Sequence, residues 1–191
     1  MTEDIRIVPL TDGRYIDIMT EWMYDWWGRK ENYPREAVER ALAHSLNTDR
    51  LPRTYGMLLC GRLTGMYQFT YSDLFVRPDI YPWLANVYLD PAYRGRGLGR
   101  LLLGSVKQNA RAAGLDELFL FTAHRGLYEK FGWEFAGEIE TFLEPHVQRL
   151  YRLDTSGRAE DPAADPVSKA GKLVCDVPLK GSEKGAEHDL I

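Results

Sequence analysis

The sequence predicts an α/β fold in which a mixed, mostly antiparallel sheet is flanked by helices. Hydrophobic residues make up 45% of the 191 residues and charged residues 27%, which is the balance of a soluble globular protein. Segments of strand-like composition alternate with segments whose apolar residues recur at helical spacing as far as Asp154. Residues 155–191 contain no aromatic side chain, so we expect a mostly flexible tail behind one domain of residues 1–154.

The first half of the domain is expected to combine four strands with two helices. These elements are, in chain order, a strand at 5–10, helices at 13–28 and 33–46, a two-stranded hairpin at 53–71 and an apolar strand at 83–89. Gly28 ends the first helix, and Pro34 suits the first position of the second, where no amide hydrogen is needed. Gly61 marks the turn of the hairpin. Cys60 lies in an apolar run and is expected to be a small core residue.

The second half is expected to contain one long helix, one short helix and three strands. These are, in chain order, a helix at 98–114, a strand at 117–122, a short helix at 126–132 and strands at 133–139 and 146–154. Leu98, Leu101 and Val106 belong to the apolar stripe of the long helix, and Gly114 stops it. In the tail, residues 172–179 alternate enough to form a short strand if they find a sheet edge.

A glycine-rich stretch, DPAYRGRGLGRLLL at residues 90–103, leads from the strand at 83–89 into the long helix. The first amides of a helix have no intrahelical acceptor and carry the positive end of the helix dipole, so they can bind phosphate. Glycine allows positive φ and places no Cβ against a ligand, and arginine adds charged donors. We therefore expect this stretch to hold a pyrophosphate through Gly95, Gly97 and Gly99 and through Arg94, Arg96 and Arg100.

Two common phosphate loops have a different spacing. A P-loop needs G-x-x-x-x-G-K-[ST], which the sequence lacks. A dinucleotide fingerprint needs G-x-G-x-x-G and an acidic residue after the next strand. Here the glycines follow G-x-G-x-G, and Asp116 and Glu117 come before the body of the next strand. Both alternatives fit poorly.

The spacing Arg94-x-x-Gly97-x-Gly99, after a strand ending VYLDP, resembles the acetyl-CoA-binding motif of the GNAT N-acetyltransferase superfamily. Downstream, LFLFTAHRGLYEKFGWEF at 118–135 is similar to that family's next strand and the short helix behind it. The order of elements over 5–154 resembles the family as well. The resemblance implies a GNAT-like acyl-CoA N-acyltransferase fold with acetyl-CoA as co-substrate.

The resemblance also implies which residues hold the co-substrate. The backbones of Val87 and Leu89 would pair with the pantetheine arm as if it were an added strand. The amide at or near Val87 would face the acetyl carbonyl. Residues 94–100, Leu98 among them, would wrap the pyrophosphate.

The resemblance further implies that Tyr128 protonates the leaving thiolate. Many relatives carry an asparagine just after the strand that here ends at Thr122. This sequence has TAHRG there, so either His124 replaces that contact with the cofactor or the contact is missing. No side chain in the sequence looks like a covalent nucleophile, so an amine is expected to attack the thioester directly in a ternary complex.

The acceptor side is less defined, and the general base stays open between Glu21, Asp25 and His124. The stretch TEWMYDWWG combines acids with tryptophans, so Trp26 and its acidic neighbours could receive a cationic amine through charge and cation–π contact. Asn86 lies on the central strand and could contact the substrate, although an amide cannot act as a base. The expected acceptor is the primary amine of a small, basic molecule.

Other interpretations stay open. The arginines could form a solvated basic face, Trp22, Trp26 and Trp27 could belong to the core, and Tyr128 could be a packing residue. Residues 77–83 either line the acceptor cleft or merely connect two strands. The chain could also acetylate peptides or proteins, or bind acyl-CoA as a non-catalytic sensor.

Composition limits the expected partners and location. The net charge of −4 does not favour a general nucleic-acid binder. No apolar stretch approaches the roughly 20 residues of a membrane span, and the acidic N-terminal segment lacks a signal-peptide pattern. We expect a cytoplasmic enzyme without nucleic-acid or membrane partners, and a homodimer stays possible. His44 and His146 have no neighbours at metal-ligand spacing, so no metal is expected.

Overall fold

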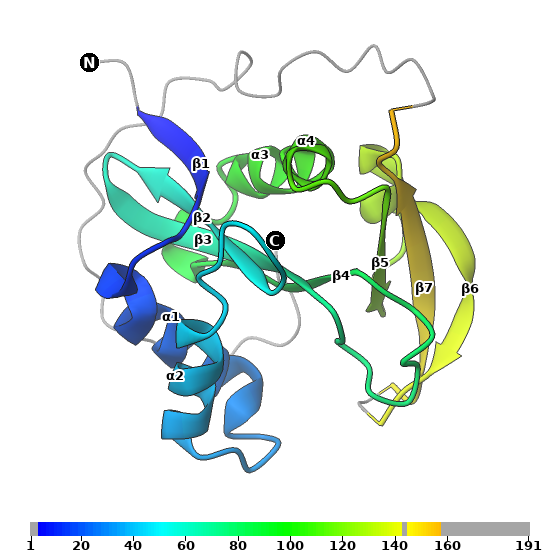
Figure 1. Cartoon of the computed structure of the whole chain (residues 1–191), viewed down its shortest axis with the longest axis horizontal. Coiled ribbons are helices and arrows are strands. Elements are labelled where there is room, and N and C mark those ends of the chain that lie inside the picture. Colours follow the sequence, from blue (N-terminus) through cyan, green and yellow to red (C-terminus); the bar gives the residue numbers. More distant parts are fainter. Residues whose placement is uncertain (1–3, 143–144, 158–191) are drawn as a thin grey trace.

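The computed structural model describes residues 4–142 and 145–157, which form a seven-stranded sheet with helices packed on its two faces (Figure 1). The strand order is β1-β2-β3-β4-β5-β7-β6, and each neighbouring pair is antiparallel except β4 and β5. The predicted mixed, mostly antiparallel sheet is confirmed. The strands are β1 (Ile5–Pro9), β2 (Arg53–Leu59), β3 (Arg62–Thr70), β4 (Trp83–Leu89), β5 (Glu117–Thr122), β6 (Glu134–Glu140) and β7 (Val147–Asp154).

The helices lie in two groups. They are α1 (Ile16–Met23), α2 (Arg35–Ala43), α3 (Leu98–Gly104) and α4 (Val106–Ala112), with short helical turns at Gly13–Tyr15, Tyr24–Gly28, Pro91–Tyr93 and Tyr128–Phe131. Successive residues of a strand point to opposite faces. Met57 of β2 accordingly joins the core under α3 and α4, while Leu58 joins the core under α1 and α2. None of the helices in the described part of the chain combines the length and apolar character that a bilayer crossing needs.

Two predicted helices are interrupted. The helix expected at 13–28 ends in a π-helical turn, Tyr24–Gly28, a widened conformation that is rare in proteins. The helix expected at 98–114 is divided at Ser105, whose hydroxyl donates to the Leu102 carbonyl at 2.8 Å. A serine that bonds back to the preceding turn competes with the helical ladder, which explains the break.

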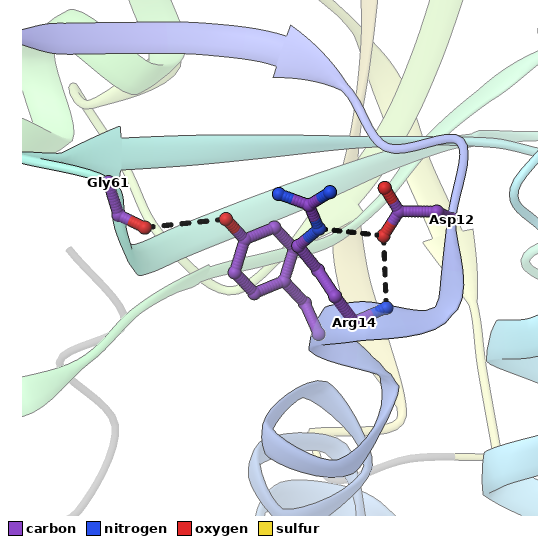
Figure 2. A network of polar contacts seen from close by, with 4 residues as sticks. Asp12, Arg14 and Gly61 are labelled. Atoms are coloured by element: carbon purple, nitrogen blue, oxygen red, sulfur yellow. Dashed lines mark hydrogen bonds and ion pairs between the residues drawn. The ribbon is translucent and has the colours of Figure 1, made fainter.

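The start of α1 is tied to the turn between β2 and β3. Figure 2 shows the Asp12 carboxylate, which accepts hydrogen bonds from the backbone amide and the Nε of Arg14, both at 3.0 Å. The Tyr15 hydroxyl donates to the Gly61 carbonyl at 3.3 Å. These contacts set where the first helix leaves the sheet.

The prediction that Cys60 is a core residue is wrong. Cys60 and Gly61 form the two-residue connection of the β2–β3 hairpin, with φ of +50° and +79°. A tight hairpin turn of this kind needs positive φ at both central residues and projects them away from the core. Cys60 is accordingly exposed.

The folded domain continues past residue 154. Thr155 is buried, its amide donates to the Asp116 carbonyl at 2.9 Å, and its own carbonyl accepts from Arg111 Nε at 3.1 Å. These bonds fasten the end of β7 to α4 and to the segment between α4 and β5. Most of the tail expected at 155–191, including the candidate strand at 172–179, lies outside the described residues.

Candidate active site

β4 and β5 lie side by side for a single residue pair. Trp83 stands opposite Phe119 in this parallel pair, and the Phe119 amide donates to the Pro82 carbonyl at 2.9 Å. Beyond this point the two strands run apart (Figure 1), so residues 84–89 have no partner in β5. An extended ligand with amide groups can occupy such an opening as an added strand.

The strand that borders this opening contains a β-bulge. On β4, Ala85 pairs with Gln68 and Tyr88 pairs with Met66. The two β4 residues between these pairs, Asn86 and Val87, therefore share Tyr67 as their one opposing residue on β3. Asn86 has a φ of +51°, a left-handed conformation that asparagine adopts more readily than most residues. The Val87 side chain is buried in the core under α3 and α4.

The glycine loop leaves the start of α3 uncapped. Gly97 is the N-cap residue with a φ of +78°, and α3 has neither a side-chain cap nor an acidic residue in its first turn. Gly95 has a φ of +72°, and a Cβ added at either glycine would meet no atom within 4 Å. This geometry fits an anion held by backbone amides.

The third glycine of the loop differs from the prediction. Gly99 is buried within the first turn of α3 and has helical backbone, so it does not provide a positive φ. The fully buried Leu98 beside it anchors this turn in the core. Gly99 therefore serves close packing of the helix, whereas Gly95 and Gly97 shape the open loop.

Three arginines surround the glycine loop. Arg94 ties it to the end of β4, because its Nε donates to the Leu89 carbonyl at 3.0 Å and its guanidinium lies 5.8 Å from the centre of the Tyr88 ring. Arg96 and Arg100 are exposed. Their positive charge would favour an anion at this loop.

Tyr128 lies in the short helical turn after β5. Its side chain is 6% exposed and packs against Trp133 and Tyr151, with ring centroids 6.0 and 6.1 Å apart. Burial raises the pKa of its hydroxyl, and the nearby charge of Asp73 raises it further. Tyr128 is therefore protonated at neutral pH and can act as a hydrogen-bond donor.

Asp73 interacts electrostatically with Tyr128 from the connection between β3 and β4. Its surface is accessible to solvent, yet desolvation by the surrounding protein raises the pKa of its carboxyl group from 3.8 to about 7. The charge of Glu31, in the loop before α2, raises this pKa as well. Asp73 thus interacts electrostatically with both Tyr128 and Glu31, which lie in separate segments of the chain.

The comparison with known families identifies the family of the domain that carries this site. Residues 16–133 match the model of the family described as "Acetyltransferase (GNAT) family". This chain belongs to the GNAT acetyltransferase family. The matched region contains the divergent strands, the bulge, the glycine loop and Tyr128, and the predicted family is confirmed. No curated protein matches the sequence.

Solved structures of GNAT proteins share the fold at low identity. A GNAT family acetyltransferase from Elizabethkingia anophelis with acetyl-CoA bound has a TM-score of 0.55 at 18% identity, over 78% of this chain and 97% of that one. A GNAT family acetyltransferase from Staphylococcus aureus Mu50 has a TM-score of 0.55 at 16% identity, over 80% and 99%. Aminoglycoside acetyltransferase AAC(6')-Ib in complex with coenzyme A and kanamycin has a TM-score of 0.60 at 16% identity, over 79% and 95%. At these identities the similarity establishes the fold alone.

The acids expected to bind the acceptor lie on the exposed surface of α1 and of the turn after it. Glu21 is exposed on α1, and Asp25 is exposed and ion-paired with Arg29 at 2.7 Å. Trp26 is half-buried and packs at a tilt on Tyr88 of β4, with ring centroids 6.0 Å apart. The turn after α1 therefore rests on the same strand that carries the bulge.

The remaining predicted residues have internal contacts. Asn86 accepts a hydrogen bond from Trp27 Nε1 at 3.2 Å and donates to Gln68 Oε1 at 2.6 Å. His124 is half-buried after β5, and its backbone amide donates to Thr122 Oγ1 at 3.1 Å. Among the described residues, no group of three or more acidic, histidine or cysteine side chains is placed to hold a metal ion.

Sequence reasoning missed Asp73, Glu31 and Gln68. None of them belongs to a motif, and they come from three separate parts of the chain. The one available signal was the neighbouring segment 77–83, which was expected either to line the acceptor cleft or merely to connect two strands. Only the folded chain places Asp73 close to Tyr128.

Proposed function

We propose that this GNAT domain transfers the acetyl group of acetyl-CoA to the primary amine of a small, cationic acceptor by direct attack in a ternary complex. The observation that carries the proposal is the opening between β4 and β5. The bulged strand β4 borders this opening, and the uncapped glycine loop follows β4 in the chain. Support for a cationic amine comes from the negative charge of Asp73, which acts on Tyr128, and from that of Glu31, which acts on Asp73.

The cofactor side fits coenzyme A. In this proposal the backbones of Val87 and Leu89 pair with the pantetheine amides, and His124 contacts the cofactor from the end of β5. The amides of residues 95–99 bind the pyrophosphate together with the arginines around them, Arg94, Arg96 and Arg100. The relatives solved with acetyl-CoA and with coenzyme A support this assignment.

The reacting groups act on the acetyl carbon. The Val87 amide donates to the carbonyl oxygen, where negative charge develops as the amine attacks. The carbon–nitrogen bond forms, the carbon–sulfur bond breaks, and the electron pair leaves with sulfur. Burial holds the pKa of Tyr128 above its usual value, whereas a thiol has a pKa of about 8.5. Tyr128 therefore stabilises the thiolate by hydrogen bonding, and the proton released from the amine nitrogen completes the thiol.

The acceptor side favours a cation. A lysine-like amine has a pKa of about 10.4, so it arrives as an ammonium ion and must lose a proton before it attacks. Asp73 is the favoured base because its pKa of about 7 lets it accept that proton near neutral pH, and Glu31 adds negative charge. Asp25 is less suited because it already pairs with Arg29. A relative of the same fold is an aminoglycoside acetyltransferase in complex with kanamycin.

The test measures thiol release from acetyl-CoA with cationic, neutral and anionic amines, alongside calorimetric titration of coenzyme A. We expect saturable binding of coenzyme A and the fastest turnover with small cationic amines. Binding without thiol release from any amine would support the acyl-CoA sensor instead, and turnover with peptides alone would support a protein acetyltransferase. Absence of coenzyme A binding would overturn the proposal.

A further inference from the structure

We propose that Trp27, Asn86 and Gln68 are positioning residues that orient the Val87 amide for the reaction. They form a hydrogen-bonded chain from the turn after α1 into the sheet. The inference rests on the proposed function, which gives the Val87 amide its role at the acetyl oxygen. It adds three side chains that do not need to touch either substrate.

The chain joins several elements through short hydrogen bonds. Trp27 Nε1 donates to Asn86 Oδ1 at 3.2 Å, and Asn86 Nδ2 donates to Gln68 Oε1 at 2.6 Å. Gln68 Nε2 donates to Ser45 Oγ and to Thr54 Oγ1, both at 2.8 Å. The chain therefore starts in the π-helical turn, crosses β4 and β3, and ends at β2 and the segment after α2.

The direction of every link is fixed by the two ends. An indole N–H can only donate, and at the far end the Ser45 hydroxyl donates to the Leu42 carbonyl at 2.6 Å, which can only accept. If the Asn86 amide were rotated by half a turn, its NH₂ group would face the Trp27 N–H, and two donors would meet without an acceptor. Gln68, Ser45 and Thr54 are buried, so a reversed or broken link would leave a buried polar group unsatisfied.

This chain controls the backbone that carries the reacting amide. The Val87 N–H belongs to the planar peptide unit that follows Asn86, so the backbone angles of Asn86 set its direction. Asn86 holds an uncommon φ of +51° while its side chain is bonded at both ends of the amide. Trp27 supplies one of those bonds from the same turn as Trp26, which links the expected acceptor side to the bulge.

Two variants break the chain at different places, and a third is a matched control. Trp27→Phe keeps an aromatic ring and removes the donor, and Gln68→Met keeps the volume and removes the amide. Trp22→Phe is the control, because Trp22 stacks on Tyr88 of the same strand at 5.1 Å but lies outside the chain. We expect the first two to lower kcat about tenfold while both KM values and the Kd of coenzyme A change by less than about twofold, since only transition-state binding is lost.

A second readout needs no turnover. NMR hydrogen exchange at the Trp27 indole N–H should be slow in the wild type and faster in Gln68→Met, although no hydrogen bond joins these two residues directly. Asn86→Gly, which tolerates positive φ, should retain more activity than Asn86→Ala, which does not.

The outcomes separate this inference from the proposed function. Folded Trp27→Phe and Gln68→Met proteins with wild-type kcat would overturn the inference, as would equal losses in kcat and coenzyme A affinity. If Gln68→Met does not fold, Trp27→Phe at its half-buried position decides the question. If none of the tested amines leads the wild type to release thiol, the proposed function fails. The positioning role then fails as well, whatever the result of the indole exchange measurement.

Discussion

The cofactor side and the acceptor side of β4 are built from different parts of the chain. On the cofactor side the groups that matter are backbone amides, from Val87 through the left-handed Gly97 to the first turn of α3. On the acceptor side they are side chains, Asp73 and Glu31, that meet from separate loops. A backbone site needs glycines at fixed positions and so leaves a local motif, whereas a side-chain site needs only convergence in space.

The two sides also differ in their surroundings. The long connection from β3 to β4, which carries Asp73, also contains Phe75, which stacks on Phe142 at 5.3 Å with an interplanar angle of 9°. Both rings are largely exposed, at 74% and 67%. The cofactor side instead presents arginines around an open loop. In the proposed function a charged cofactor and its acceptor would therefore meet different chemistry.

The largest expected effect comes from Tyr128, which is proposed to donate a hydrogen bond to the leaving thiolate. Tyr128→Phe should lower kcat about 100-fold, because a positioned hydrogen-bond donor to the developing charge contributes on this order, and it should leave the Kd of coenzyme A unchanged. Steady-state kinetics and calorimetry measure the two quantities. Equal activity of the two proteins would mean that Tyr128 only packs against Trp133 and Tyr151.

The next largest effect should be confined to the acceptor side. Asp73→Asn should lower kcat/KM for a cationic amine about 30-fold, with a much smaller loss for a neutral one, because the charge partner is removed. In the wild type kcat/KM should rise as the pH passes through about 7, where the Asp73 carboxyl loses its proton. That limb of the pH profile should be missing in the variant, and its persistence would assign the base elsewhere.

A smaller effect should be confined to the cofactor side. Gly97→Ala should weaken coenzyme A binding about fivefold to thirtyfold, because the left-handed conformation of the bound loop costs an alanine about 1–2 kcal/mol. Gly61→Ala is the control, since Gly61 has nearly the same φ of +79° and equally open space in the β2–β3 turn. Equal Kd values for the two variants would argue against the glycine loop as the anion site.

The smallest expected effect concerns stability. The pKa of Asp73 is higher in the folded protein than the 3.8 of the unfolded chain, so its contribution to stability is lost as the pH rises through about 7. Asp73→Asn should therefore be more stable than the wild type at pH 8 and equal to it near pH 3. The gain should be about 1 kcal/mol or less, because solvent screens an accessible carboxylate. Thermal unfolding across this pH range measures it, and a less stable variant at pH 8 would contradict it.

The order of elements was predictable because each is encoded within its own segment. Apolar periodicity located the strands and helices, and the spacing from Arg94 to Gly99 predicted the family. Departures occur where a neighbour competes with local preference. Ser105 bonds back and divides a helix, and the tight hairpin turn takes Cys60 out of the core. Gly99 lies in the same glycine pattern as Gly97, and only the position at which α3 begins separates their roles.

The sequence by itself determined the backbone half of this protein: the fold family, the order of the elements and the glycine loop expected to hold an anion, because glycine placement and periodicity are local properties. Only the tertiary structure brought Asp73 to Tyr128 and linked Trp27 to Gln68 through Asn86. Those residues lie tens of positions apart and share no spacing rule. Their proximity results from how the helices and loops pack on β3 and β4, which a pattern along the chain does not specify.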